Sequence, residues 1–470
     1  MHHSGGPIDQ DDITSALAVF SVWARRESKH GTTEVIYLET RTMGDVGTLN
    51  QLGPEYKSLK INPSRFNDAL QYSCQWGATD DGGMNRLSGN DDDKAVRDWF
   101  IAETAKYGCS HKVDTMGNIF AIRPGQINDL PPIGLGSHLD TQPTGGRYDG
   151  ILGVHCALEV LRVIDEAGIT TYAPLAIINW TNEEGARFPP AMLGSGVWAG
   201  QYTLDHGHSR ESVEGVSMAQ ELKRIGYMGK VPCSSEQNPL SAHFEVHIEQ
   251  GTILEKENQP VGVVRGAQSV RWFRLVVSGR AQHTGGTPME KRCDAILAAA
   301  KVVVLVHQEA TDRGIRATVS TIKSDPQSMN TIAGKAELSL DLRAPSDADM
   351  DDLEASLRQS FEKIQAETRT KFEMLPVWNS PAEFFDESMV ECVRQSAKEL
   401  GSSVEMMSFI GHDSVYTSKI VPTAMIFARC RDGISHSPDE YTSPEDCASS
   451  AQVLLGSYLR RDQYLRSVHQ

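Results

Sequence analysis

Two adjacent glutamates, Glu183 and Glu184, closely follow the apolar run APLAIINW, which has the composition of a buried strand. At the end of a core strand, one carboxylate can bind a metal ion while its neighbour handles a proton. Hydrolysis of a stable amide needs an activated water, and a metal supplies it by lowering the pKa of that water toward ~7. We therefore assign Glu183 as the acid–base group and Glu184 as a metal ligand. The alternative is a polar turn in which Arg187 pairs with the two acids.

A histidine and two aspartates follow a second strand-like segment, PPIGLGSHLD. His138 lies at its carboxyl end, where ligands bind in open α/β sheets. Residues two apart on a strand share a face, so Asp140 is expected to reach an imidazole nitrogen of His138 and orient the ring. Asp149 precedes a predicted helix, where its carboxylate could cap the helix or bridge two metal ions. The alternatives are a solvent-exposed His-x-Asp and an ordinary capping aspartate.

Further histidines occur in HFEVHIEQG and in RDGISHSPDEYTSPED. His247 would share one face of a strand with Glu245 and Glu249, and His436 follows an apolar strand in a loop rich in Ser and Pro. Single histidines in such places are more often ordinary polar residues than ligands. Two nitrogens and two carboxylates around zinc would nevertheless be chemically sensible. The spacing of these segments does not by itself show that they converge.

Composition restricts the class of protein. The 470 residues predict two to three domains. A formal net charge of −17 argues against a general nucleic-acid binder, which needs clustered Lys and Arg. No apolar run approaches the roughly 18 residues needed to cross a bilayer, and the N-terminus lacks the features of a secretory signal. The 8 cysteines show no CxxC spacing and fit reduced thiols. We therefore expect a cytoplasmic protein with no nucleic-acid or membrane partner.

The order of the predicted elements indicates an α/β domain with a smaller domain inserted in it. Near-continuous apolar strands separated by a helix, over residues 131–180, are typical of a parallel sheet covered on both faces. From about residue 259 to 375 the order becomes β-α-β-β-α-β, a ferredoxin-like unit. We divide the chain into an N-terminal extension of unknown role, the first part of the catalytic domain, the inserted domain, and the second part of the catalytic domain, at residues 1–57, 58–258, 259–375 and 376–470.

Five motifs, in this order, are similar to those of a known enzyme group: GSHLDTQPTGGRYDG, NEEGARFPPAMLGSG, HIEQGTILE, GRAQHTGGTPMEKRCDA and ISHSPDEYTSPED. They resemble the dinuclear-zinc amidohydrolases that cleave N-carbamoyl amino acids, N-carbamoyl-β-alanine and allantoate. That group is a branch of the aminoacylase and carboxypeptidase metallopeptidase clan, and the resemblance covers about residues 58–470. It implies a discontinuous zinc-peptidase-like catalytic domain and an inserted ferredoxin-like α+β domain that forms a homodimer. It also implies two divalent metal ions per subunit, zinc first, with manganese, cobalt and nickel as alternatives.

The resemblance also implies roles for individual residues. Asp149 would bridge the two ions, and Glu183 would be the general base. The implied metal ligands are His138, Asp149, Glu184, His247 and His436. The peptidases of the clan typically have a carboxylate at the position of His247, so aminoacylase or peptidase activity on the same fold is the weaker alternative.

Residues of the inserted domain resemble the family's substrate-contacting groups. His283 resembles the histidine that stabilises the tetrahedral oxyanion, and Asn330 and Arg343 resemble substrate-binding residues, with Gln250 beside them. The guanidinium of Arg343 suits a substrate carboxylate, which it can bind through two hydrogen bonds. The alternatives are a polar loop histidine and a surface arginine at a strand end.

The expected activity is hydrolysis of the ureido C–N bond of an N-carbamoylated amino acid to the amino acid, ammonia and carbon dioxide. N-Carbamoyl-β-alanine is the first candidate substrate, N-carbamoyl-L-α-amino acids the second and allantoate the third. A non-catalytic dimeric binding protein is the alternative from another class. GHDSVY also matches a family segment, but the sequence assigns no role to His412 or Asp413.

Overall fold

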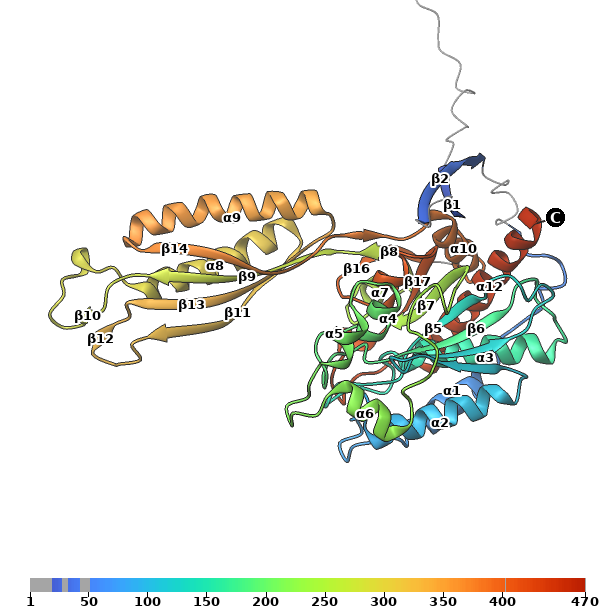
Figure 1. The fold of residues 1–470 in the computed structure, drawn as a ribbon. Coiled ribbons are helices and arrows are strands. Elements are labelled where there is room, and N and C mark those ends of the chain that lie inside the picture. The colour runs from blue at the N-terminus through green and yellow to red at the C-terminus, as the bar shows by residue number, and fades with distance from the viewer. Residues whose placement is uncertain (1–18, 28–32, 43–50, 402, 470) are drawn as a thin grey trace, which may run out of the picture.

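The computed structural model describes residues 19–27, 33–42, 51–401 and 403–469, with side chains described from residue 51 onward. A larger unit is built around a nine-stranded sheet, and an elongated smaller unit around a four-stranded sheet (Figure 1). The smaller unit interrupts the larger one in the sequence, so the chain leaves the larger sheet and later returns to it. This arrangement confirms the expected α/β fold with an inserted α+β unit.

The strands of the larger sheet come from both sides of the insertion. In chain order they are β3 (Ser110–Val113), β4 (Ile119–Arg123), β5 (Ile133–His138), β6 (Leu175–Trp180), β7 (Ala242–Ile248), β8 (Val261–Ala267), β15 (Glu383–Phe384), β16 (Val404–Ser408) and β17 (Thr423–Ala428). The four central strands, β6, β5, β7 and β17, run parallel and are buried along their whole length. Outside them, β4, β3, β8 and β15 pair antiparallel, so the sheet is mixed.

Helices cover the larger sheet. They are α1 (Pro63–Ser73), α2 (Asp91–Ala105), α3 (Ile151–Glu166), α4 (Leu193–Trp198), α5 (Leu204–His208), α6 (Met218–Ile225), α7 (Ile253–Lys256), α10 (Glu387–Lys398), α11 (Asp413–Thr417) and α12 (Pro444–His469). Helix α1 begins with residues that favour a helix start. The Asn62 side chain caps it, and Pro63 is its first residue. None of the helices in the described residues is long and apolar enough to cross a membrane.

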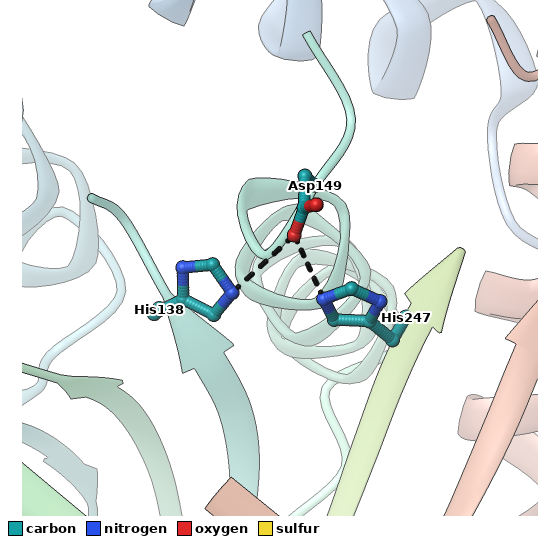
Figure 2. A group of neighbouring side chains, drawn as sticks. All are labelled: His138, Asp149 and His247. Atoms are coloured by element: carbon teal, nitrogen blue, oxygen red, sulfur yellow. Dashed lines mark ion pairs between the residues drawn. The ribbon is translucent and has the colours of Figure 1, made fainter. Parts of the chain in front are cut away.

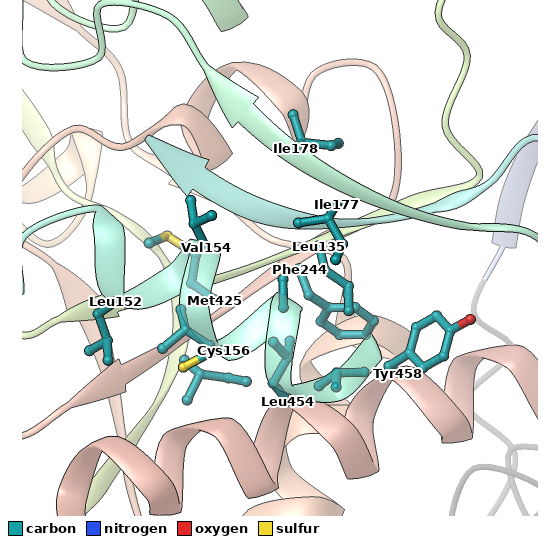
Figure 3. Packing of buried hydrophobic residues seen from close by; sticks show 14 of the residues in the cluster. Leu135, Leu152, Val154, Cys156, Ile177, Ile178, Phe244, Met425, Leu454 and Tyr458 are labelled. Atoms are coloured by element: carbon teal, nitrogen blue, oxygen red, sulfur yellow. The ribbon is translucent and has the colours of Figure 1, made fainter. Parts of the chain in front are cut away.

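The main core lies between the central strands and the helices α3 and α12. Leu135, Ile177, Phe244 and Met425 project from the four parallel strands toward these helices (Figure 3). The helices contribute Leu152, Val154, Cys156, Leu454 and Tyr458 to the same cluster. Burial of both the strands and the helix faces explains why the strands read as continuous apolar runs. It also leaves the carboxyl ends of the strands as the place where polar groups can gather.

The smaller unit has its own core. Its elements are β9 (Ser269–Ser278), α8 (Ala295–Arg313), β11 (Arg316–Asp325), β13 (Lys335–Ala344), α9 (Asp347–Thr368) and β14 (Lys371–Ser380), and its sheet order is β11-β13-β9-β14 with antiparallel pairing. Alternate apolar residues of β9 and β13 pack under α8 and α9 in a second cluster. A short pair, β10 (Gln282–His283) and β12 (Thr331–Ile332), extends from the end of this unit farthest from the larger sheet (Figure 1).

Strand pairing places the junctions between the units later than we expected from the sequence. β8 (Val261–Ala267) pairs with β17 of the larger sheet, although it lies beyond the expected boundary at residue 259. β14 continues to Ser380 rather than ending near residue 375. A run of apolar residues such as β8 is expected in either sheet. The sequence pattern therefore could not show at which residue the chain passes from the larger unit to the smaller one.

The segment before residue 58 contains structure that the sequence analysis did not predict. β1 (Val19–Glu27) and β2 (Thr33–Thr42) form an antiparallel pair. Leu52 and Tyr56 are buried in the core of the larger unit, and the backbone N–H of Gly53 donates to the Gln463 side chain. Residues 51–57 therefore pack with the larger unit. The rest of the expected N-terminal extension, residues 1–57, lies largely outside the described residues.

This packing predicts different outcomes for two truncations. A chain that begins at Gln51 keeps both buried side chains and is expected to melt at the temperature of the full chain. A chain that begins at Ser58 loses both, and loss of one buried large apolar side chain typically costs about 2–5 kcal/mol. Thermal unfolding should show a lower Tm for the second chain only. Equal Tm values for the two would contradict the assigned packing.

Candidate metal centre

The candidate ligands are brought together by the ends of the parallel strands. His138 is the last residue of β5, and Glu183 and Glu184 follow β6. His247 is next to last in β7, and His436 follows β17 after a short loop. Because the carboxyl ends of parallel strands meet at one edge of the sheet, the four segments converge there. Asp149 joins them from the turn that leads into α3.

One group of ligands is fully buried. Asp149 Oδ1 lies 3.5 Å from His138 Nε2 and 3.0 Å from His247 Nε2 (Figure 2). A Cβ atom at Gly150 would lie 2.2 Å from the His138 ring, so only glycine allows the turn after Asp149 to pass this close. The two imidazoles and the carboxylate can each offer one atom to the same cation.

A second group lies beside the first and shares Asp149 with it. His436 Nε2 is 3.4 Å from Asp149 Oδ2 and 3.4 Å from Glu184 Oε2. In each group the offered ligand atoms lie within 4.8 Å of one another. Each oxygen of the Asp149 carboxylate therefore faces a different group, which is the geometry of a ligand that bridges two ions.

Hydrogen bonds turn two of the imidazoles toward the centre. His138 Nδ1 lies 2.9 Å from the backbone carbonyl of Asp140, and His247 Nδ1 lies 3.0 Å from that of Ile248. A carbonyl only accepts, so both Nδ1 atoms carry hydrogen, and Nε2 of each ring points at Asp149, where its lone pair would be available to a metal ion. Among the described residues, His138 Nε2 and Glu184 Oε1 have no hydrogen-bond partner. Buried acceptors that face one another in this way fit divalent cations.

The pKa shifts of the buried residues also indicate a cation-binding site. Burial raises the pKa of Glu183 well above its usual range, and the neighbouring Asp413 and Glu184 carboxylates add to the shift against the opposing effect of His138. Burial and the Asp149 charge raise the pKa of Glu184 to about 7. Burial lowers the pKa of His138, but the Glu183 and Asp149 carboxylates outweigh it and hold the pKa well above its usual range. Without a cation, this environment favours protons on both glutamates and on His138, and a bound divalent cation would replace them.

Asp140 acts through a different group from the one we expected. Its carboxylate oxygen is 4.0 Å from His138 Nδ1, and its backbone carbonyl makes the hydrogen bond to the ring instead. The carboxylate accepts from the backbone N–H groups of Glu183 at 3.2 Å and Glu184 at 3.3 Å. Asp140 thus holds the two glutamates in place.

Gln250 contacts the metal-binding residues directly. Its side-chain amide donates to Asp149 Oδ2 at 2.7 Å and to Ser435 Oγ at 2.8 Å. We expected Gln250 to contact substrate, whereas here its amide is used by the bridging carboxylate. Ser435, which the sequence analysis did not single out, lies within hydrogen-bonding distance of both Gln250 and Asp149.

The segment that carries His412 and Asp413 borders the centre. The His412 ring lies 4.5 Å from the His247 ring, and its Nε2 is 3.0 Å from Ser408 Oγ. Burial and the neighbouring His247 hold the pKa of His412 well below its usual range. Asp413 is buried and accepts a hydrogen bond from Ser195. The first turn of α11 therefore packs against the first ligand group.

The structure does not bring His283 and Asn330 to the ligands of their own chain. Both lie on the extension formed by β10 and β12, where the Asn330 carbonyl accepts from Thr284 N–H at 3.0 Å. His283 Nδ1 accepts from the N–H groups of Gly285 and Gly286 at 3.0 and 3.1 Å. This extension projects away from the larger unit (Figure 1), so the two residues are close to each other and remote from the metal centre.

Arg343 lies near the junction between the two units. Its guanidinium donates twice to the Asp341 carboxylate, and its Nη1 donates to the Phe409 carbonyl at 2.6 Å. Arg316 lies over the Phe409 ring at 3.4 Å. Because Phe409 is three residues before His412 in the sequence, the two arginines connect the smaller unit to the segment that borders the centre.

The fold and the paired ligand groups define a metal-dependent hydrolase. Residues 134–460 match the model of the family described as Peptidase family M20/M25/M40, and the chain belongs to this family. The family generally binds two divalent metal ions, in agreement with two ligand groups that share a carboxylate.

Individual relatives identify the branch of the family. The chain is 40% identical over 406 residues, 86% of this chain and 97% of the relative, to an N-carbamoyl-L-amino-acid amidohydrolase of Rhizobium meliloti. It is 30% identical over 428 residues, 87% of this chain and 88% of the relative, to a ureidoglycolate hydrolase of Arabidopsis thaliana. A crystal structure of an amidase of the hydantoinase/carbamoylase family from Burkholderia multivorans matches with a TM-score of 0.82 and 42% identity, over 86% of this chain and 98% of that chain. The protein is therefore a carbamoyl amidohydrolase, acting on carbon–nitrogen bonds other than peptide bonds.

The hydrogen bonds of Asp140 predict a loss of activity when its charge is removed. In Asp140→Asn, one of the two backbone N–H groups of Glu183 and Glu184 would face an amide N–H₂, and kcat is expected to fall about 10- to 100-fold, as for other residues that orient metal ligands. Asp129→Asn, a change at an exposed loop carboxylate, is the matched control. Equal kcat values for the two variants would show that Asp140 does not orient the glutamates.

Proposed function

We propose that this chain hydrolyses N-carbamoyl-L-α-amino acids to the free amino acid, ammonia and carbon dioxide. The observation that carries the proposal is the pair of ligand groups sharing Asp149, with the buried carboxylate of Glu183 beside them, in a chain whose relatives include N-carbamoyl-L-amino-acid amidohydrolases. N-Carbamoyl-β-alanine, which the sequence analysis ranked first, becomes the second candidate. It moves the carboxylate by one carbon, a difference worth about 1–3 kcal/mol in a binding site.

His138, Asp149, Glu184, His247 and His436 would hold the two ions. Bound divalent ions would lower the pKa of a water and polarise the ureido carbonyl. Glu183, whose carboxylate lies 3.4 Å from His138 Nε2, would take the proton of the attacking water and pass it to the amino nitrogen as the C–N bond breaks. The carbamate that remains would decompose to ammonia and carbon dioxide.

Arg343 would bind the substrate carboxylate. Its contact with the Phe409 carbonyl supports this role, because it places the guanidinium beside the segment that leads to His412. In the present structure the Arg343 guanidinium donates to the Asp341 carboxylate. A substrate carboxylate would have to replace at least one of these hydrogen bonds. A planar guanidinium favours such a two-point exchange more than an ammonium would.

A homodimer would explain the position of His283 and Asn330. We infer that the extension carrying them completes the centre of a second copy of the chain. The edge strand β11 offers unpaired backbone groups to such a partner. The adjacent helix α8 supports this inference, since Leu297 and Val304 are exposed apolar residues seven positions apart on it. In that arrangement His283 would stabilise the oxyanion of the tetrahedral intermediate.

Ammonia release from a panel of substrates tests the proposed reaction. The zinc-loaded protein is expected to turn over an N-carbamoyl-L-amino acid faster than its D enantiomer, N-carbamoyl-β-alanine, allantoate or ureidoglycolate. Faster turnover of ureidoglycolate would favour the second candidate function, which the Arabidopsis relative suggests. Hydrolysis of an N-acetyl-L-amino acid alone would contradict the proposal.

Glu183→Gln is expected to abolish this turnover while both ions stay bound, because the ligands remain and the proton acceptor is lost. Metal content by mass spectrometry and ammonia release measure the two effects separately. Glu184→Gln is the matched comparison, since it is expected to lose metal as well as activity. Near-normal turnover by Glu183→Gln would refute the assigned base.

Mixed dimers test whether the site is shared between subunits. Glu183→Gln and His283→Ala chains are each expected to be inactive alone. Random mixing would restore about one quarter of the sites, because half of the dimers are mixed and each of these has one site with both groups intact. If His283 serves its own chain, mixing would recover no activity.

A further inference from the structure

Glu440 is a buried carboxylate beside the metal-binding residues to which the proposed reaction gives no role. It lies four residues after His436, between β17 and α12, and is 4% exposed. One oxygen accepts from the backbone N–H groups of Tyr148 at 2.9 Å and Asp149 at 3.1 Å. The other accepts from Ser435 Oγ at 3.0 Å. Both oxygens of the Glu440 carboxylate are therefore satisfied by hydrogen bonds from neighbouring groups.

These bonds join two segments that are distant in the sequence. Tyr148 and Glu440 are separated by 292 residues. One segment is the turn that presents Asp149, and the other is the loop that presents His436. Ser435 Oγ also lies 2.9 Å from Asp149 Oδ2, so the hydroxyl touches both carboxylates.

The backbone packs closely around the Glu440 carboxylate. A Cβ atom at Gly146 would lie 2.2 Å from the Glu440 carboxyl carbon, so the turn closes directly onto this group. The Tyr148 and Tyr441 rings meet edge to face at 6.0 Å on the same junction. The loop and the turn therefore fit together around Glu440.

The two ligand groups depend on this junction to different extents. His138 and His247 project from strands and are oriented by backbone carbonyls. His436 projects from a loop, is half-exposed, and has a φ of 53° that is unfavourable for a non-glycine residue. The loop that carries His436 meets the turn that carries Asp149 at the hydrogen bonds of Glu440.

We propose that Glu440 is a positioning residue that fixes the bridging carboxylate of Asp149 relative to His436 and so maintains the second metal site. The inference concerns how the ligands are held and rests on the metal-binding part of the proposed function. Its readout is metal binding, so it can fail while hydrolysis of N-carbamoyl amino acids stands, and the reverse also holds.

Cobalt titration of the metal-free protein tests the proposal. In wild type, two ions are expected to bind, each with its own visible absorption. Glu440→Asp withdraws the carboxylate by one methylene, and Glu440→Ala removes it. Both are expected to weaken the second ion about 10- to 100-fold, to change the spectrum of that ion only, and to lower kcat with little change in KM.

Glu440→Gln is the conservative variant. Its amide oxygen can still accept from both backbone N–H groups while its N–H₂ donates to Ser435, so it is expected to keep both ions and most of the activity. Glu445→Ala, at an exposed position on the first turn of α12, is the matched control and should behave as wild type.

Wild-type cobalt affinities and spectra in Glu440→Asp would overturn the proposal, and so would equal weakening of both ions. If Glu440→Ala fails to fold, Glu440→Asp decides, because it retains the charge and most of the volume. Loss of the second ion in Glu440→Gln as well would show that the charge rather than the hydrogen-bond geometry holds the junction, and would contradict the positioning role.

Discussion

Burial of several carboxylates at one edge of a sheet is the constraint on which the rest of this structure depends. Asp149, Glu183, Glu184 and Glu440 are all removed from most of the solvent, and like charges in a medium of low polarity repel strongly. Two imidazoles whose Nδ1 hydrogens point to carbonyls direct Nε2 into the same space, where a cation would replace the proton that the carboxylates otherwise favour. Divalent cations are the partners that satisfy such a set of acceptors.

The fold provides the framework that offsets the electrostatic cost of burying these carboxylates. The four parallel strands bury apolar side chains on both faces and bring their carboxyl ends to one edge, where backbone N–H groups and loop hydroxyls can hold the acids. The Asp140 carboxylate, for example, accepts hydrogen bonds from the backbone N–H groups of Glu183 and Glu184. Glu440 itself is held by the turn that it positions. Each acid at the centre is therefore supported by a neighbour that is not one of the candidate metal ligands.

The sequence predicted the parts of this structure that have a local pattern. Near-continuous apolar runs identified the central strands, and the β-α-β-β-α-β order identified the inserted unit. The Asp140 prediction failed in its detail because it assumed strand periodicity, whereas β5 ends at His138. Glu440 had no local signal, since its partners lie 292 residues earlier. Convergence of the five ligands rested on family resemblance, because spacing alone does not fix the distance between strands.

The inserted unit explains why one chain would not contain the whole site. Its core is separate from the main core, so its outer end can project from the larger unit without loss of packing. His283 and Asn330 lie at that end, whereas Arg343 contacts Phe409 of the larger unit. In the proposed dimer, one inserted unit would thus contact substrate at two centres, its own through Arg343 and the partner's through His283.

The central requirement is that two cations compensate the buried carboxylates. Calorimetric titration of the metal-free protein with zinc measures this directly. We expect two ions per chain, release of protons on binding, and a higher Tm, since binding at ~1,000 times Kd stabilises a folded protein by about 4 kcal/mol. A protein that binds one ion or none, with an unchanged Tm, would contradict this expectation.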